Sequence, residues 1–219
     1  MSGRIIAIGD IHGCLAALET LLSAIVPRSD DTIVALGDYA DRGPNVSGVL
    51  ERLIALDKQT RLVPLLGNHD ETMLSICRGR LDLLGDWLMF GGNATLASYA
   101  THSPAGIWPT HLEFLARCLL AFETERHFFV HANYRADTPL DRLSREVLLW
   151  ESLKRHVPGP HFSRKTAIVG HTAQKSGKIL DLGHLKCIDT WCYGDGWLTA
   201  LEVESGRCWQ ADKHGALRK

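Results

Sequence analysis

The segment IIAIGDIH at residues 5–12 joins a run of apolar residues to a short polar cluster, and this arrangement recurs along the chain. Apolar runs of this length indicate buried strands. In open α/β sheets, ligands bind beyond the carboxyl ends of the strands, which is where such clusters would lie. We therefore expect the clusters to meet at one edge of the fold. The other four segments are IVALGDYADRG at 33–43, LVPLLGNHD at 62–70, FFVHAN at 128–133 and AIVGHT at 167–172.

The first seventy residues alternate expected strands with expected helices. The intervals from Asp10 to Asp38 and from Asp38 to Asn68 are 28 and 30 residues, close to the length of a βαβ unit, roughly 30 residues. Apolar residues at helical spacing predict helices over about 14–26 and 45–56. The N-terminal part therefore predicts parallel strands connected by helices.

The rest of the chain has a different pattern. Residues 78–127 read as a helical insert, and residues 134–165 as a long ordered loop. Short strands separated by turns follow, and we expect them to be antiparallel. Strand–helix alternation followed by antiparallel strands predicts an α/β (α+β) fold, with two packed β-sheets flanked by helices, in one domain over residues 1–219. The C-terminal strands are predicted at 178–181, 185–189, 197–203 and 207–210.

Composition excludes several classes of protein. The 219 residues carry a formal net charge of −1 with acids and bases mixed along the chain, which gives no electrostatic basis for binding nucleic acid or a membrane surface. The six cysteines form no CxxC pair, so we expect reduced thiols rather than a disulfide framework. No apolar stretch is long enough to span a bilayer. We expect a cytoplasmic protein; the sequence gives no indication of its oligomeric state.

The polar clusters supply the ligand types of a metal site. Carboxylates and imidazoles suit Mn, Fe or Zn. Asp10 and His12 are separated by one residue and can point to the same side of a strand end, while Asp38 can bridge two cations because its oxygens carry several lone pairs. Each residue alone would more simply be a turn or cap residue, but their coincidence at five strand ends favours a shared site. The candidate metal ligands are Asp10, His12, Asp38, Asn68, His131 and His171.

Three further residues beside these ligands suit phosphoryl chemistry. The planar guanidinium of Arg42 can bind a phosphoryl group through two nitrogens; the simpler alternative is a surface arginine paired with Asp41. His69 adjoins Asn68 and can act as a general acid. We expect Asp41 to orient the His69 ring and to raise its pKa.

These motifs together resemble the calcineurin-like metallophosphoesterases, and more specifically the phosphoprotein-phosphatase family with its bacterial and phage serine/threonine phosphatases. The resemblance covers residues 9–172. It implies a central β-sandwich of two sheets and a dinuclear centre of Mn or of Fe and Zn at the strand ends. One metal would be held by Asp10, His12 and Asp38, and the other by Asp38, Asn68, His131 and His171. The same resemblance implies His69 with Asp41 as the acid pair and Arg42 on the phosphate.

The chain departs from the family pattern in two places. Asn133 stands where the family usually has a glycine after His-Ala. The family also supplies a second phosphate-binding arginine between the last two histidine ligands, and we favour Arg155 among five candidates, the others being Arg135, Arg142, Arg145 and Arg164. Asp189 and His184 could support the site or could equally be turn and strand-end residues.

The predicted reaction is phosphomonoester hydrolysis by direct attack of a water or hydroxide that bridges the two metals. The predicted substrate is a protein phosphorylated on serine or threonine, or a small phosphoester. One alternative is symmetrical hydrolysis of bis(5'-nucleosyl) tetraphosphates; enzymes of that type resemble the chain but typically lack the aspartate before the loop arginine, so Asp41 favours the phosphoprotein. A second alternative is a catalytically silent metal-binding interaction module, although Asp38, His69 and Arg42 are all present.

Overall fold

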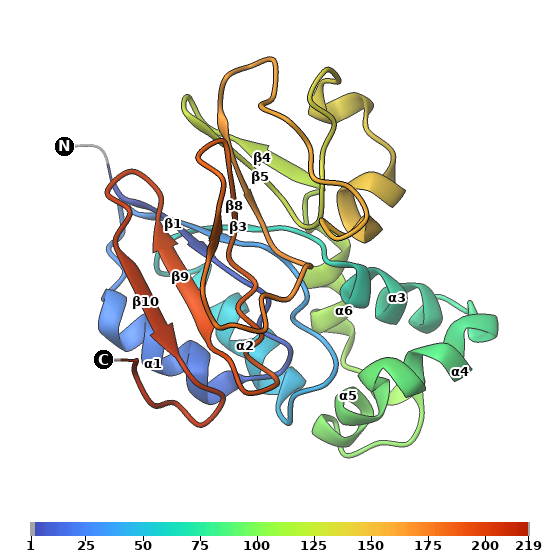
Figure 1. Cartoon of the computed structure of the whole chain (residues 1–219). Coiled ribbons are helices and arrows are strands. Elements are labelled where there is room, and N and C mark those ends of the chain that lie inside the picture. Colours follow the sequence, from blue (N-terminus) through green and yellow to red (C-terminus); the bar gives the residue numbers. More distant parts are fainter. Residues whose placement is uncertain (1–2, 219) are drawn as a thin grey trace.

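The computed structural model describes residues 3–218, and this part of the chain contains two mixed five-stranded β-sheets (Figure 1). In the first sheet β1, β2 and β3 are parallel, and β9 pairs antiparallel with β1 and with β10. Its strand order is β10-β9-β1-β2-β3. Its strands are β1 Ile5–Ile8, β2 Thr32–Ala35, β3 Arg61–Pro64, β9 Leu198–Glu202 and β10 Cys208–Ala211.

The second sheet has the order β4-β5-β6-β8-β7. β5, β6 and β8 are parallel, and the short edge strands β4 and β7 are antiparallel to their neighbours. The carboxyl ends of β5 and β6 lead into the last two polar clusters. The strands of this sheet are β4 Ala121–Glu123, β5 His127–Val130, β6 Thr166–Val169, β7 Leu180–Asp181 and β8 Leu185–Cys187.

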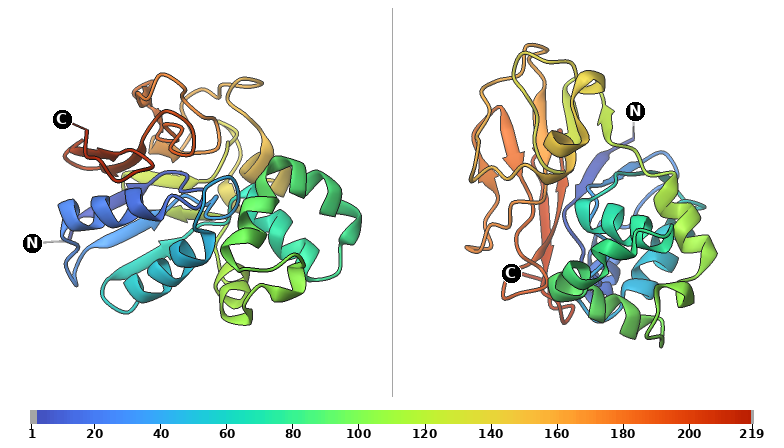
Figure 2. Two further views of the ribbon diagram at one scale, coloured as in Figure 1. Left: turned by 90° about the horizontal axis from the view of Figure 1, so that it is seen from below. Right: turned by 90° about the vertical axis from the view of Figure 1, so that its right-hand side faces the viewer.

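The two sheets pack face to face because side chains alternate between the two faces of each strand. Ala7 and Val34 of the first sheet share one buried apolar cluster with Phe129 and Ile168 of the second. Ile6, Ile8 and Ile33 point to the other face of the first sheet, where they pack with the helices in a separate cluster. Figure 2 shows the helices on one side of the first sheet and the second sheet on the other. The sandwich fixes the relative positions of strand ends from both sheets.

The helices follow the predicted apolar spacing. Asn45 caps α2, since its side chain accepts a hydrogen bond from Gly48 N at 3.0 Å, and α3 begins at Asn68 inside the third polar cluster. The short helices of residues 81–116 lie together beside α3 (Figure 1). No helix among residues 3–218 is both long and apolar enough to cross a membrane. The helices are α1 Leu15–Ile25, α2 Val46–Leu56, α3 Asn68–Cys77, α4 Leu84–Trp87, α5 Asn93–Ser98 and α6 Pro109–Ala116.

The structure differs from the sequence prediction in two details. The last helix of the predicted helical insert 78–127 ends at Ala116, because residues 121–123 form β4 against β5. β8 is parallel to β6, whereas the prediction had only antiparallel strands in this region. The connection of residues 170–184 is long enough for the crossover that parallel pairing requires. Residues 134–165 lack regular strands, as predicted, apart from the short helical turns Leu140–Arg142 and Glu146–Trp150.

Candidate metal centre

The loops at the strand ends have strained backbones where the candidate side chains lie. Five of the candidates have positive φ angles between 44° and 70°, which is uncommon for residues other than glycine. Such conformations cost about 1–3 kcal/mol each and cluster at functional sites. The residues with a strained backbone are therefore among those whose side chains form the candidate site. The five are His12, Asp38, Asp41, Arg42 and His171.

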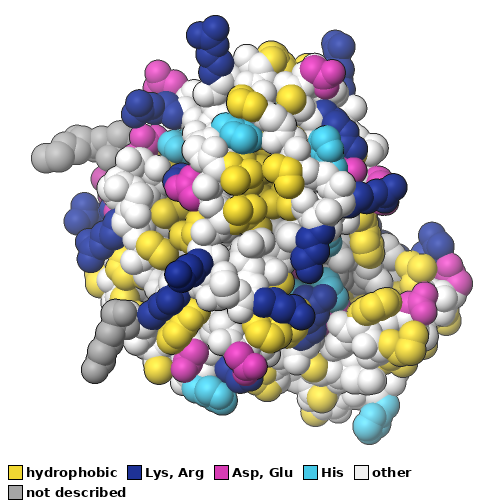
Figure 3. Space-filling view, in the orientation of Figure 1, with side chains coloured by type: hydrophobic (Ala, Val, Ile, Leu, Met, Phe, Trp, Pro, Cys, Tyr) yellow, Lys and Arg dark blue, Asp and Glu magenta, His cyan; other side chains and the backbone are white. Residues whose placement is uncertain are grey.

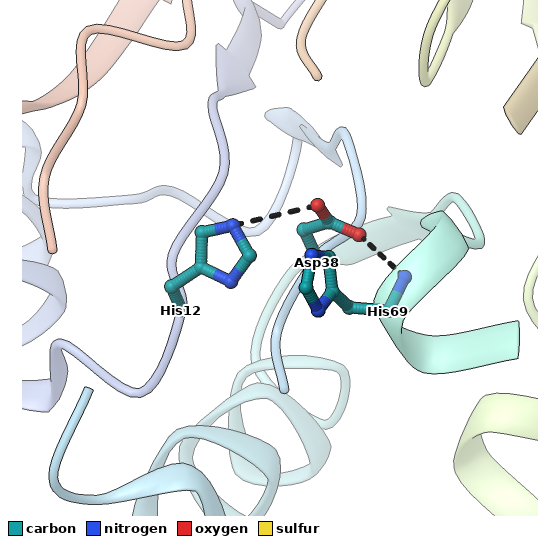
Figure 4. Close-up of side chains that lie close together, drawn as sticks. All are labelled: His12, Asp38 and His69. Carbon is teal, nitrogen blue, oxygen red and sulfur yellow. Dashed lines mark hydrogen bonds and ion pairs between the residues drawn. The ribbon is translucent and has the colours of Figure 1, made fainter. Parts of the chain in front are cut away.

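Asp38 is the centre of the cluster. Its Oδ2 lies 3.4 Å from His12 Nε2 and its Oδ1 lies 3.5 Å from His131 Nε2, while the His69 backbone N–H donates to Oδ1 at 3.0 Å (Figure 4). Burial alone would raise the pKa of Asp38, but the surrounding histidines, His131 foremost, hold it well below its usual value. Two groups of possible metal ligands share this carboxylate: Asp38 with His12 and His69, and Asp38 with His131 and His171.

Backbone carbonyls fix the tautomer of each histidine ligand candidate. The Nδ1–H groups of His12 and His131 donate to the carbonyls of Ala40 and Leu36, both at 2.8 Å. His171 donates instead through Nε2–H, to the Trp150 carbonyl at 3.0 Å. The other ring nitrogen of each histidine therefore carries a lone pair.

The protonation states agree with this arrangement. Burial lowers the pKa of His12 and of His131, and that of His171 to about 4. All three rings are thus neutral at pH 7. Neutral imidazole with its second nitrogen hydrogen-bonded is the form that binds metals.

Asn68 and Asp10 add further oxygen atoms with lone pairs to this cluster. Asn68 Oδ1 lies 3.1 Å from His131 Nε2 and 2.9 Å from His171 Nδ1, so three atoms with lone pairs face one another. Asp10 Oδ2 accepts from His171 N at 2.9 Å, whereas Asp10 Oδ1 is buried without a hydrogen-bond partner among the described residues. A Cβ on Gly170 would lie 2.1 Å from Asp10 Oδ1. An orphaned buried carboxylate oxygen is costly unless a cation neutralises it. The donor set fits two divalent cations that share Asp38.

A second arrangement lies beside this cluster. His69 Nδ1 is 2.7 Å from Asp41 Oδ2, and the Arg42 guanidinium donates to His69 Nε2 at 2.8 Å and to His12 Nε2 at 2.7 Å. Burial opposes protonation of His69, yet the negative charge of Asp38 and the bond to Asp41 raise its pKa overall. The Arg42 guanidinium also lies over the Tyr193 ring at 4.4 Å. A protonatable imidazole and an arginine fork therefore face the same space.

Four residues that contact this site were not predicted from the sequence: Trp87, Thr95, Asp70 and Tyr193. Trp87 Nε1–H donates to both oxygens of Asp41, at 2.9 and 3.0 Å, and the Thr95 hydroxyl donates to Asp41 Oδ1 at 2.6 Å. Asp70 Oδ1 accepts from Tyr39 N and Ala40 N, both at 3.0 Å, and so holds the loop that carries Asp38. The signal for Asp70 was its place in Gly-Asn-His-Asp. Nothing in the local sequence marks Trp87, Thr95 or Tyr193.

The remaining candidate residues are exposed or make their hydrogen bonds outside this cluster. Arg155 is exposed and is not among the residues that line the cavity over the site. His184 Nε2 is 3.0 Å from the Pro158 carbonyl. Asn133 is buried and donates to the His156 carbonyl at 2.9 Å, so it holds the 134–165 segment. Asp189 accepts from Trp191 N at 3.0 Å, and burial raises its pKa to about 6.

A cavity of about 420 Å³ opens over the site. Arg42, Asn68, His69 and His171 are among the residues that line it. On the face of the molecule in Figure 3, Lys and Arg side chains are interspersed with Asp and Glu. The cavity therefore gives a ligand space beside Arg42 and His69.

Comparisons with known proteins agree with this geometry. The family model described as calcineurin-like phosphoesterase matches residues 3–195. A curated protein of Acidovorax ebreus (strain TPSY), named bis(5'-nucleosyl)-tetraphosphatase, symmetrical, is 40% identical over 103 residues, covering 44% of this chain and 36% of that protein. A protein of the same name from Janthinobacterium sp. (strain Marseille) is 31% identical over 134 residues, covering 58% and 42%. The matches thus span less than half the length of these curated relatives.

Solved structures match over more of the chain. A structure described as "a putative diadenosine tetraphosphatase" has a TM-score of 0.71 and 25% identity, and covers 96% of this chain and 94% of its own. A cold-active protein-tyrosine phosphatase of a Shewanella species has a TM-score of 0.64 at 19% identity, covering 100% of this chain and 80% of its own. At that identity the second likeness concerns the fold alone.

Proposed function

Because the chain belongs to the calcineurin-like phosphoesterase family and is a hydrolase of phosphoester bonds, we propose that its substrate is a dinucleoside tetraphosphate, cleaved symmetrically into two nucleoside diphosphates. The observation that carries this proposal is the similarity to proteins named for that activity, including 40% identity over 103 residues. The phosphoprotein substrate that Asp41 favours becomes the second candidate. The family match supports a hydrolase rather than a silent module. The cytoplasmic location stays a prediction.

The proposed metal ligands follow from the donor set. One divalent cation would be held by Asp10, His12 and Asp38; the other by Asp38, Asn68, His131 and His171. Two such cations, of Mn, Fe or Zn, would supply Lewis acidity towards the phosphoryl oxygens and lower the pKa of a water molecule. Support comes from the unpaired oxygen of Asp10 and from the tautomers of the three histidines.

Arg42 would bind the phosphoryl group. Its two terminal nitrogens donate to His12 and His69 in the absence of substrate, and a phosphoryl group offers stronger, charged acceptors for the same fork. When the fork turns to phosphoryl oxygens, His69 Nε2 loses its donor and becomes free to carry a proton. Arg42 thus couples substrate binding to the protonation of His69.

His69 would donate that proton to the departing oxygen. Its Nδ1–H is held by Asp41, which stabilises the imidazolium, and Asp41 is in turn held by Trp87 and Thr95. Proton donation of this kind contributes about 10²–10⁴-fold to the rate. The second phosphate-binding arginine stays a prediction for Arg155.

The test is a substrate panel on protein stripped of metal and refilled with Mn²⁺, Fe²⁺ or Zn²⁺ separately. Diadenosine tetraphosphate, a phosphoserine peptide and p-nitrophenyl phosphate are compared by kcat/KM, and nucleotide products are separated by chromatography. We expect ADP as the only nucleotide product from diadenosine tetraphosphate. Equimolar AMP and ATP, or turnover of the phosphopeptide alone, would contradict the proposal.

A further inference from the structure

The cavity over the site is lined by side chains of two chemical kinds. Arg42 and His69 can carry a positive charge, whereas Leu83, Phe90 and Trp150 are apolar or aromatic. Phe90 is 63% exposed and Trp150 is 42% exposed. Large aromatic side chains left in contact with solvent beside a reactive site mark a ligand-binding surface more often than a structural one.

Trp150 is held in a fixed orientation. Its indole N–H donates to Glu71 Oε2 at 2.9 Å, and Glu71 Oε1 accepts from Arg145 Nε at 2.7 Å. The backbone carbonyl of Trp150 accepts from His171 Nε2 at 3.0 Å. The indole is therefore held by Glu71 before a ligand arrives, and the Trp150 backbone is bonded to His171, which also lines the cavity.

The backbone next to Phe90 is bonded to Arg42. It precedes Gly91, whose carbonyl accepts from Arg42 N at 3.2 Å. Gly91 has a φ of 119°, and a Cβ there would lie 2.7 Å from Arg42 N. Only glycine allows this close approach at that φ. The backbone of the helical insert thus sets the position of Phe90 relative to the arginine.

We propose that the aromatic side chains of the cavity bind the nucleobase of the substrate, with Phe90 and Trp150 as the stacking groups; this rests on the proposed function and deepens it. Aromatic side chains bind bases through their π-faces. The Asp86 carboxylate also lines the cavity; it can accept hydrogen bonds from ribose hydroxyls or an exocyclic amine and repels a further phosphate. A volume of about 420 Å³ lies in the range of small-molecule sites. The cavity thus combines aromatic side chains with an arginine that can bind phosphate, and a nucleotide requires both.

The test compares two ligands that differ only in the nucleoside. Dissociation constants of α,β-methylene-ADP and of methylenediphosphonate are measured by calorimetry on the metal-loaded protein, at the same excess of metal. Wild-type protein is compared with Phe90→Ala, Phe90→Tyr and Met89→Ala. Met89 is 77% exposed, adjoins Phe90 and does not line the cavity, so it is the matched control.

We expect the nucleoside to tighten binding to wild-type protein at least tenfold, a value within the range of base–aromatic stacking of about 1–3 kcal/mol. Phe90→Ala should reduce this advantage about tenfold, whereas Phe90→Tyr and Met89→Ala should keep it. Equal affinity of wild-type protein for both ligands, or an advantage that survives Phe90→Ala, would overturn the inference. A variant that loses turnover of a phosphopeptide with flanking leucines, while its nucleoside selectivity is unchanged, would also overturn the inference. The aromatic side chains would then bind peptides.

Failure of the proposed function has a different signature. If diadenosine tetraphosphate is not hydrolysed but the nucleoside advantage is present in wild-type protein and lost in Phe90→Ala, the base site stands. The tetraphosphate substrate alone would then be wrong.

Discussion

Trp87 donates its indole N–H to both carboxylate oxygens of Asp41, at 2.9 and 3.0 Å. Trp87 belongs to the helical insert and Asp41 to the loop after β2, so this contact joins the insert to the proposed acid pair. The Trp87 ring is buried, and a Cβ on Gly92 would lie 2.4 Å from it. Trp87 of the insert therefore holds Asp41, the residue that orients His69.

Trp87→Phe should lower kcat without loss of metal. The substitution removes the N–H donor but retains an aromatic ring, so Asp41 is less firmly placed. We expect a fall in kcat for p-nitrophenyl phosphate of about 10-fold to 150-fold, which corresponds to the loss of one hydrogen bond to a charged group, about 1.5–3 kcal/mol. Trp108→Phe is the control because Trp108 is 43% exposed and its ring packs against Tyr99 and His111. A Trp87→Phe protein with unchanged kcat would show that the contact has no role in turnover.

His69→Asn should reduce kcat by about 10²–10⁴-fold while metal content is unchanged, because it removes a proton donor and not a proposed ligand. Substrates with good leaving groups need less protonation and should be affected less. Kinetics with phenyl and p-nitrophenyl phosphate, together with metal analysis, check this. Loss of metal in step with activity would instead place His69 among the ligands, as its distance from Asp38 also allows.

The pH dependence of kcat should report the raised pKa of His69. A raised pKa keeps the acid protonated to higher pH, so the basic limb should lie above the usual histidine value of about 6.5. Asp41→Asn removes one of the contacts that raise this pKa, and the basic limb should move to lower pH. A full kcat profile from pH 5 to 9 for both proteins is the measurement. A shift to higher pH in Asp41→Asn would contradict the assigned pairing.

Asp10→Asn should stabilise the metal-free protein and weaken its response to metal. Burial, then the charges of Asp189 and Asp38, raise the pKa of Asp10. A carboxyl with a raised folded pKa destabilises the fold above that pKa, so neutralising it should raise the melting temperature of the metal-free protein at pH 8. Added Mn²⁺ should raise the melting temperature of wild-type protein and have less effect on the variant. A metal-free variant that melts below wild type would be evidence against an unpaired charge at this position.

Asp31 provides a stability test remote from the site. Its buried carboxylate accepts from Arg4 N at 3.0 Å, Arg4 Nε at 3.1 Å and Arg28 N at 2.8 Å. Burial opposes ionisation, but these bonds lower the pKa of Asp31 overall. Asp31→Asn should cost about 1–3 kcal/mol of unfolding free energy at pH 7.

The sign of the pH effect at Asp31 follows from its lowered pKa. The stabilisation is present above the unfolded pKa of about 3.9 and is lost as pH falls through the lower folded value. The difference between wild type and Asp31→Asn in urea unfolding should therefore shrink from pH 7 to pH 3. Asp82→Asn, at an exposed pair with Arg80, should change stability little at either pH. A difference that grows towards pH 3 would mean that the carboxylate is not stabilised by folding.

The sequence predicted the sandwich well because its strands are short apolar runs that end in polar clusters. β1, β2 and β3 begin within one residue of the apolar runs that start at residues 5, 33 and 62, and the structure brings the predicted metal-ligand candidates together. β4 was not predicted, because Ala-Phe-Glu at 121–123 is too short to show a period and forms only by pairing with β5. The parallel placement of β8 depends on a crossover, which local pattern does not encode.

The proposed site was less fully predictable where tertiary contacts decide a role. Trp87, Thr95 and Tyr193 are separated from Asp41 and Arg42 by 45 or more positions, and no motif surrounds them. The choice of Arg155 among the five later arginines had no support from a local motif for the same reason. In the structure Arg135 pairs with Glu151 and Arg145 with Glu71, whereas Arg155 is exposed.

The most direct test is anomalous scattering from crystals grown with Mn²⁺, recorded at the manganese absorption edge. Two peaks on opposite sides of the Asp38 carboxylate are expected, one beside Asp10 and His12, the other beside Asn68, His131 and His171. A single peak, or two peaks that do not share Asp38, would contradict a pair of cations held by one carboxylate.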